Sequence, residues 1–301
     1  MSRPLYVASP IFYMGSKYKL LRDIIPLFPK HIDVFYDLFG GSGVVSINVC
    51  GRCNRVVYND FNENVVNLLH MFKVSSPQEL NTYFENKKRI YNLRTNSSKD
   101  TYMDDMGNYL KMRDDYNKSN PKDYRDLYLL SCYSINHLMR FNSNNEFNVS
   151  GGRNSYSSRI YSLIINAYEK LKGIELNNLN IFDFNFDNIT SNDFVYLDPP
   201  YTNTWAVYNE KGTFGGWELK DDLKLFNIID ELNLRGVKFG LSNVFSNRGV
   251  ENTHLIEWAK KYRVHHLHRH YHPFSTESSD SDEVYITNVD ENPIIKTQEL
   301  W

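Results

Sequence analysis

Residues 35–49 of this 301-residue chain read Phe-Tyr-Asp-Leu-Phe-Gly-Gly-Ser-Gly-Val-Val-Ser-Ile-Asn-Val. The apolar start predicts a strand over residues 35–39, residues 40–43 predict a tight turn, and residues 44–49 predict a helix. A strand, a glycine-rich turn and a helix in this order open a Rossmann-like unit, and the glycines let a ligand approach the backbone closely. The stretch therefore predicts an α/β fold with a ligand site at a strand end.

A second strand is expected over residues 55–58, and it ends in Asn59-Asp60. Asp60 follows the glycine turn by about 20 residues, a spacing at which such folds place an acid on the ribose hydroxyls of a nucleotide. The alternative is that Asp60 caps a helix beginning near residues 61–63. One carboxylate can fill both roles.

A third feature is Asp198-Pro199-Pro200-Tyr201, which follows an apolar run that reads as a short buried strand. The carboxylate can accept a hydrogen bond from an amine, and the prolines hold an extended backbone with free carbonyls. The tyrosine ring can stack on a planar base. This combination suits the holding of an exocyclic amino group, although Asp is also a common opener of ordinary turns.

The segment before the glycine unit, residues 12–17, reads Phe-Tyr-Met-Gly-Ser-Lys. Taken alone, it predicts a helix start with Ser16 as its cap and an apolar face that begins at Leu20 and Leu21.

Together, these segments occur in the order seen in the Dam-type DNA adenine-N6 methyltransferases, which the chain resembles from about residue 12 to residue 288. Residues 140–149 are similar to that family's recognition hairpin, and residues 236–243 and 282–288 are similar to two of its later strands. The nearest likeness is to the Dam enzymes of T-even phages, which share Lys238-Phe239-Gly240 and Glu251-Asn252-Thr253.

The resemblance implies a Rossmann-like, S-adenosylmethionine-dependent methyltransferase fold with an inserted, mainly helical target-recognition subdomain that contains a β-hairpin. Residues 10–73 and 174–288 would form the catalytic domain, residues 74–173 the insert and residues 289–301 a tail. Within the insert, the sequence predicts helices over residues 77–89, 103–118, 124–138 and 157–172, with Gly173 as a cap. Residues 219–234 predict an amphipathic helix before Gly236, and residues 237–241 predict a strand.

The implied function is site-specific adenine-N6 methylation of DNA, with base flipping and direct methyl transfer from S-adenosylmethionine, within GATC or a related motif. Asp198 and the Pro199 carbonyl would accept the two N6 hydrogens, Pro200 would keep the backbone rigid and Tyr201 would stack on the base. The resemblance implies a set of cofactor-binding residues: Tyr13, Lys17, Asp37, Phe39, Gly40, Gly41, Ser42, Gly43, Asp60, Phe184 and Asp198. Phe182 and Phe186 stand two positions either side of Phe184.

The predicted DNA contacts lie in the insert, because Arg pairs with guanine and Asn with adenine in the major groove. They are Asn136, Arg140, Asn142, Asn148 and Arg153. The alternative is that an Asn-rich hairpin simply makes good turns. The family's hairpin continues into Pro-x-Gly, whereas this chain continues Ser150-Gly151-Gly152-Arg153, which puts the target GATC in doubt.

The composition limits the partners. With a net charge of −2 and a pI of about 6.5, the protein as a whole is not basic. A DNA-binding surface must therefore come from a local cluster of positive side chains. The three cysteines (Cys50, Cys53 and Cys132) suit a reducing cytoplasm and complete no metal site, and no apolar run is long enough to span a membrane. The expected partner is double-stranded DNA. The protein is expected to act as a monomer or weak dimer in the cytoplasm of a bacterial or phage-infected cell. Whether a cognate restriction endonuclease is a second partner is left open by the sequence.

Three other readings remain. A cytosine-N4 methyltransferase also uses an exocyclic amine, but those enzymes more often carry Ser at the position of Asp198. A non-catalytic relic that binds DNA or the cofactor would keep the fold without the reaction. A nicotinamide dehydrogenase would explain the glycine turn but has no use for Asp198-Pro199-Pro200-Tyr201.

Overall fold

A mixed β-sheet forms the centre of the computed structural model, which describes residues 5–94, 102–202, 216–267 and 281–290. In this part of the chain the strand order is β3-β2-β1-β4-β5-β8-β7, with β6 paired to the end of β5. The strands are β1 (Val34–Asp37), β2 (Arg55–Asn59), β3 (Ile174–Asn177), β4 (Phe194–Leu197), β5 (Lys238–Asn247), β6 (Val250–Glu251), β7 (Arg263–Leu267) and β8 (Ser281–Thr287). Strands β1 to β5 run parallel, whereas β6, β7 and β8 pair antiparallel.

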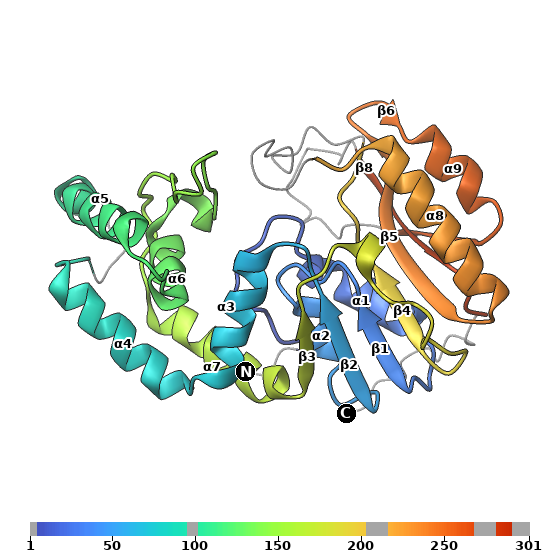
Figure 1. The fold of residues 1–301 in the computed structure, drawn as a ribbon, viewed down its shortest axis with the longest axis horizontal. Helices are drawn as coiled ribbons and strands as arrows, with labels where there is room; N and C mark the ends of the chain where they lie inside the picture. Colours follow the sequence, from blue (N-terminus) through green and yellow to red (C-terminus); the bar gives the residue numbers. More distant parts are fainter. Residues whose placement is uncertain (1–4, 95–101, 203–215, 268–280, 291–301) are drawn as a thin grey trace.

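Helices cover both faces of the sheet. Successive side chains of a strand point to opposite faces, and here both sets are apolar and need to be covered. Phe35 and Phe194 lie in one apolar core, and their neighbours Tyr36 and Val195 lie in the other. The first core is covered by η1 (Lys17–Leu20), α1 (Leu21–Ile24), η2 (Ile25–Leu27), α2 (Val44–Val49) and α3 (Glu63–Val74). The second is covered by α8 (Leu219–Leu234) and α9 (Thr253–Ala259), which Figure 1 shows beside β5. The predicted α/β class is confirmed.

The chain changes direction across the sheet between β1 and β4. From β1 it proceeds outward to β2 and β3, and it then returns to place β4 on the other side of β1. The carboxyl ends of two adjacent parallel strands at such a switch point are where ligands bind in open α/β sheets. Asp37 ends β1, and Asp198 follows β4 directly.

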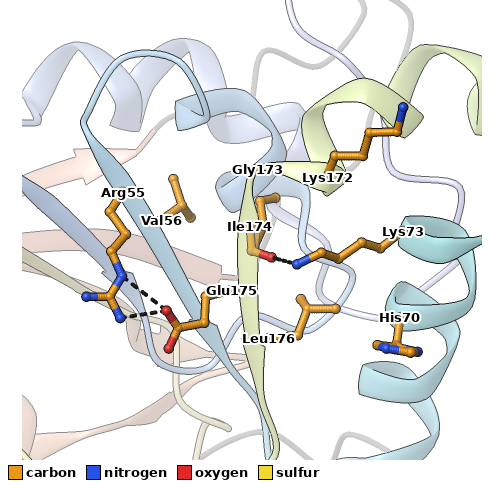
Figure 2. A pocket seen from close by; sticks show the side chains of 9 residues that line it. All are labelled: Arg55, Val56, His70, Lys73, Lys172, Gly173, Ile174, Glu175 and Leu176. Carbon is orange, nitrogen blue, oxygen red and sulfur yellow. Dashed lines mark hydrogen bonds and ion pairs between the residues drawn. The ribbon is translucent and has the colours of Figure 1, made fainter.

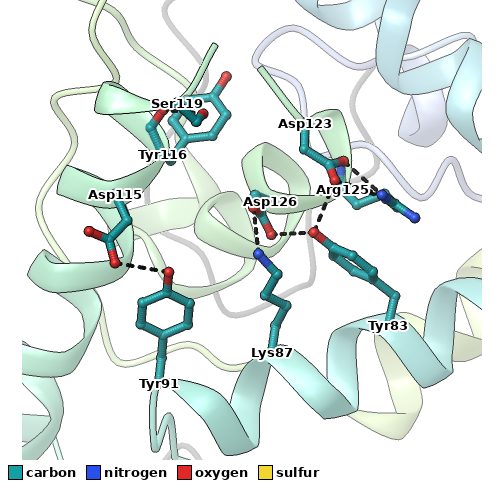
Figure 3. Close-up of polar contacts among 9 residues, drawn as sticks. All are labelled: Tyr83, Lys87, Tyr91, Asp115, Tyr116, Ser119, Asp123, Arg125 and Asp126. Carbon is teal, nitrogen blue, oxygen red and sulfur yellow. Dashed lines mark hydrogen bonds and ion pairs between the residues drawn. The ribbon is translucent and has the colours of Figure 1, made fainter. Parts of the chain in front are cut away.

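The region predicted to be the insert, residues 74–173, contains α4 (Pro77–Ile90), α5 (Tyr102–Lys118), α6 (Tyr124–Tyr133), η3 (Ile135–His137) and α7 (Ser158–Lys172). Figure 1 shows α4, α5 and α6 away from the sheet, beyond α3. Polar contacts tie α4 to its neighbours (Figure 3): the Tyr83 hydroxyl shares its one hydrogen between Asp126 at 2.8 Å and Asp123 at 3.0 Å, and Lys87 pairs with Asp126 at 2.8 Å.

Two local expectations were wrong. The helix predicted over residues 124–138 ends at Tyr133, because Ser134 is extended and its hydroxyl bonds the carbonyls of Ser131 and Leu138. Asn136 and His137 then take left-handed φ values of 53° and 56°. Ser16 precedes η1 but makes no side-chain capping bond.

The predicted hairpin is present without regular strands. Its two arms meet at the isolated bridges Phe141–Phe147 and Ser134–Gly151. No helix in the described ranges has the length and apolar character needed to cross a membrane.

Candidate active site

The turn after β1 is shaped by its glycines. The Gly40 N–H donates to the Asn59 carbonyl at 2.9 Å, so the turn is fixed against the end of β2. A β-carbon on Gly40 would lie 2.1 Å from the buried Tyr58 ring, and the Tyr58 hydroxyl donates to the Gly41 carbonyl at 2.7 Å. Gly43, with a φ of 71°, opens α2. Close packing therefore requires glycine where the sequence predicted a ligand turn.

Asp37 is buried under this turn. Its Oδ2 accepts bonds from the Ser46 hydroxyl at 2.6 Å and the Ser46 N–H at 3.2 Å, while its buried Oδ1 has no hydrogen-bond partner among the described residues. Burial raises the pKa of Asp37 to about 7, against the opposing effect of the Ser46 bonds. The carboxyl group is thus available to a ligand donor.

Asp60 connects the turn to the start of α3. Its Oδ2 accepts from the Gly41 N–H and its Oδ1 from the Asn62 N–H, both at 2.8 Å. The N-cap of α3 is Asn62, whose side chain accepts from the Asn64 N–H. Asp60 therefore sits one turn before the helix and is not its cap, and burial raises its pKa.

Asp198 meets a partner from the far end of the sequence. Lys17 Nζ lies 2.6 Å from Asp198 Oδ2, with the two side chains 8% and 16% exposed. The Tyr201 hydroxyl donates to Asp198 Oδ1 at 3.2 Å, and Lys17 Nζ stands 5.3 Å from the Tyr201 ring centroid. Burial raises the pKa of Asp198 although Lys17 opposes it.

A cavity of about 770 Å³ joins these groups. Of the residues singled out from the sequence, it is lined by Tyr13, Lys17, Asp37, Phe39, Gly40, Gly41, Ser42, Asp60, Asn136, Arg140, Asp198, Pro199, Pro200 and Tyr201. Gly43, Asn142, Asn148, Arg153 and Phe184 are not among the lining residues. The cavity thus unites both predicted strand-end motifs with the first part of the hairpin.

Phe184 does not line the cavity, although it packs on the same apolar core as Phe182 and Trp217. Its ring contacts Tyr36 edge-on at 6.2 Å and Phe186 at 5.3 Å. Phe182 lines the cavity in its place and stacks on Trp217 at 5.8 Å. Asn180 is the sequence feature that could have indicated this position of Phe182. It is the N-cap of η4 (Ile181–Asp183), and its side chain accepts a hydrogen bond from the Phe182 N–H. Trp217 had no sequence signal.

The polar hairpin residues mostly bond each other. Asn142 donates to Glu146 Oε2 at 2.8 Å and accepts from two backbone N–H groups of the turn, as expected of a good turn residue. Asn148 Oδ1 accepts from Arg140 Nε at 3.0 Å. Arg140 and Arg153 are exposed.

A second hollow, of about 490 Å³, lies at the amino ends of β2 and β3 (Figure 2). Its cations are engaged locally: Arg55 with Glu175, Lys73 with the Ile174 carbonyl and Lys172 with Glu169. In the described ranges, no group of three or more metal-binding side chains occurs.

The sequence is similar to those of known proteins. The family described as D12 class N6 adenine-specific DNA methyltransferase matches residues 13–272. Type II methyltransferase M.FokI of Planomicrobium okeanokoites is 39% identical over 290 residues, and modification methylase StsI of Streptococcus sanguinis is 38% identical over 293 residues. Each alignment covers 94% of this chain and 43% of the relative, so the chain spans less than half the length of these two proteins.

The DNA adenine methylase of Escherichia coli K12 is 26% identical over 260 residues, which cover 84% of each chain. The M.FokI and StsI enzymes thus match at higher identity than this adenine methylase does. The match to the family spans most of the sequence and includes both strand-end motifs. The chain belongs to the D12 class N6 adenine-specific DNA methyltransferase family.

Proposed function

We propose that the protein methylates N6 of adenine in DNA, using S-adenosylmethionine and a flipped target base within GATC or a related short motif. The observation that carries this proposal is one cavity that holds both Asp198-Pro199-Pro200-Tyr201 and the glycine turn after Asp37. The two motifs come from the carboxyl ends of β4 and β1, the adjacent strands of the switch point.

The cavity fits the cofactor by its charge. S-adenosylmethionine supplies the methyl group on a positively charged sulfur, and it also carries an ammonium group. Asp37, Asp60 and Asp198 line the cavity with three carboxyl groups, of which Asp37 is buried and the other two are partly exposed, and Asp37 Oδ1 has no donor among the described residues. Asp37 would hold the methionine end together with residues 39–43, Tyr13 and Lys17, and Asp60 would hold the ribose.

The chemistry assigned to this chain is the orientation of an amine. Lys17 holds Asp198 Oδ2, while among the described residues Oδ1 accepts only the longer bond from Tyr201. A flipped adenine could donate one N6 hydrogen to Oδ1 and the other to the Pro199 carbonyl, so that the nitrogen lone pair faces the methyl group. The Tyr201 ring would stack on the base and offset part of its unstacking cost. The rate enhancement would come from positioning and fixed charge.

Double-stranded DNA would approach the hairpin side of the cavity. Asn136 and Arg140 are exposed and line the cavity, which favours them as base contacts. Asn142, Asn148 and Arg153 would act from outside it. Because relatives carry the names Type II methyltransferase and modification methylase, a cognate restriction endonuclease is a candidate partner in the cell. We propose a monomer or weak dimer as the acting form.

The deciding experiment is modification-sensitive single-molecule sequencing of DNA from a methylation-deficient host that expresses this chain, with Asp198→Ala as the control. We expect N6-methyladenine at one short motif, lost in the variant; the sequence found decides between GATC and a related target. Absence of modified adenine, with folded protein that binds S-adenosylmethionine, would refute the proposal in favour of a binding role. Modified cytosine would identify the N4 reaction.

A further inference from the structure

The two arms of the hairpin meet in what we call the hairpin base, residues 133–135 and 150–152. The Gly152 N–H donates to the Tyr133 carbonyl at 2.7 Å, and the Ile135 N–H donates to the Ser150 carbonyl at 3.0 Å. A β-carbon on Gly152 would lie 2.7 Å from the Ile135 backbone and the Ser134 carbonyl. The arms are therefore in direct backbone contact at the place where this chain departs from the family's Pro-x-Gly.

Arg94 lies in the segment after α4 and makes hydrogen bonds to the hairpin base. Its Nη2 donates to the carbonyls of both Gly152 and Asn154. The Arg94 carbonyl accepts from the Tyr133 hydroxyl at 2.7 Å, and the guanidinium stands 5.3 Å from the Tyr133 ring centroid. One residue thus contacts both arms. Its guanidinium combines two carbonyl bonds with a position over the Tyr133 ring, and at such a site lysine is not a conservative replacement.

The hairpin base leads directly into the cavity wall. Asn136 and His137 follow it in left-handed conformations, which cost non-glycine residues free energy and persist only where the surroundings fix them. These two residues open the run 136–141, every member of which lines the cavity. The His137 ring also stacks on Phe12 with centroids 3.9 Å apart and planes inclined by 14°. The position of the hairpin base therefore sets where Arg140 and Asn136 stand.

We propose that Arg94 is a positioning residue for target choice: through Gly152, Asn154 and Tyr133 it fixes the hairpin base and, through that, the wall residues that face the target. This inference rests on the proposed function, because it assigns Arg94 to the same site. Arg94 is not assigned a contact with DNA or with the cofactor.

The test compares Arg94→Met and Arg94→Lys with the wild type on duplexes that carry the motif or a one-base variant of it. Loss of two charge-assisted bonds should raise the KM for DNA and lower the discrimination between the two duplexes, each by about ten-fold. Single-turnover rates at saturating DNA, and the affinity for S-adenosylmethionine, should stay at the wild-type level. Arg94→Lys should not restore discrimination. Gly152→Ala should reproduce the loss, because its β-carbon forces the arms apart.

Arg125→Met is the matched control, since Arg125 is another insert arginine over a tyrosine ring, 4.0 Å from that of Tyr83, but lies away from the hairpin base. Hydrogen exchange gives a readout without catalysis: amides of residues 134–152 should exchange faster in Arg94→Met than in Arg125→Met. If Arg94→Met does not fold, Arg94→Lys carries the comparison.

The outcomes separate the two proposals. Arg94 variants that keep the wild-type discrimination in an active enzyme overturn the Arg94 assignment alone, whatever the exchange rates. A wild-type chain that methylates no DNA overturns the proposed function and, with it, a role of Arg94 in target choice.

Discussion

At the scale of single residues, the buried pair of Lys17 and Asp198 joins positions 181 apart in the sequence. Burial alone would lower the pKa of Lys17, but the adjacent Asp198 carboxylate outweighs it and raises that pKa, so Lys17 stays charged. A cation held at 2.6 Å favours the ionised form of Asp198, which is the form that accepts hydrogen bonds from an amine.

We predict that Lys17→Met moves the acidic limb of the methylation rate to higher pH. Without the cation, nothing comparable opposes the effect of burial, so the pKa of Asp198 rises further and ionisation needs a higher pH. Loss of one partner of a buried pair should also lower the free energy of unfolding by about 3 kcal/mol. Single-turnover rates from pH 5 to 9 provide the measurement. Lys17→Arg, which keeps the charge, is the control, and an unshifted limb in Lys17→Met would contradict the assigned role.

At the scale of elements, two glycines offer opposite predictions. Gly107 lies inside α5, and a β-carbon there would meet nothing within 4 Å, so Gly107→Ala should raise the free energy of unfolding by about 0.5–1 kcal/mol. Gly40→Ala should destabilise the turn and abolish cofactor binding, because its β-carbon would overlap the Tyr58 ring. Urea unfolding and calorimetric titration measure both effects. Equal behaviour of the two variants would show that the close approach to Tyr58 is unimportant.

Helices and strands were predictable where the spacing of apolar residues and the position of a glycine or proline indicate the same boundary. The helix predicted over residues 219–234 is α8, and Gly236 follows it with a φ of 76°. The end of α6 was not predictable, since the left-handed pair Asn136 and His137 depends on contacts with the other hairpin arm, residues 150–152. Local sequence carries no information about such a partner.

The site divides in the same way. Asp60 and Asp198 were predictable because each directly follows a strand, and parallel strands bring their carboxyl ends to one edge; Asp37, which ends β1, was implied by the family resemblance. The pairing of Lys17 with Asp198, and the Phe182–Trp217 stack, come from tertiary packing between distant segments. Phe182 lines the cavity and Phe184 does not, and the Phe182 N–H donates to the Asn180 side chain that begins η4.

At the scale of the whole molecule, three carboxyl groups with raised pKa values line one cavity, with Asp37 buried and the other two partly exposed. Burial is the chief cause for Asp37, Asp60 and Asp198, and the negative charge of Asp198 adds to the shift of the other two. The fold thus gathers negative charge that it does not fully neutralise, and a cationic ligand would compensate for it. Stability should therefore depend on pH and on the cofactor.

We predict that the contribution of Asp37 to the free energy of unfolding of the ligand-free protein falls as pH rises from about 4 to about 7. Asp37 has a pKa of 3.8 when unfolded and about 7 when folded, so in this window its carboxyl group binds fewer protons in the unfolded chain, and its contribution to stability decreases as pH rises. Asp37→Asn should flatten the slope in part, since Asp60 and Asp198 contribute with the same sign, whereas Asp187→Asn, at an exposed carboxylate, should not. Urea unfolding at pH 5 and pH 7.5 measures the slope, and S-adenosylmethionine should stabilise more at pH 7.5, where Asp37 is ionised. Identical slopes in the wild type and Asp37→Asn would exclude Asp37 as a source of the dependence.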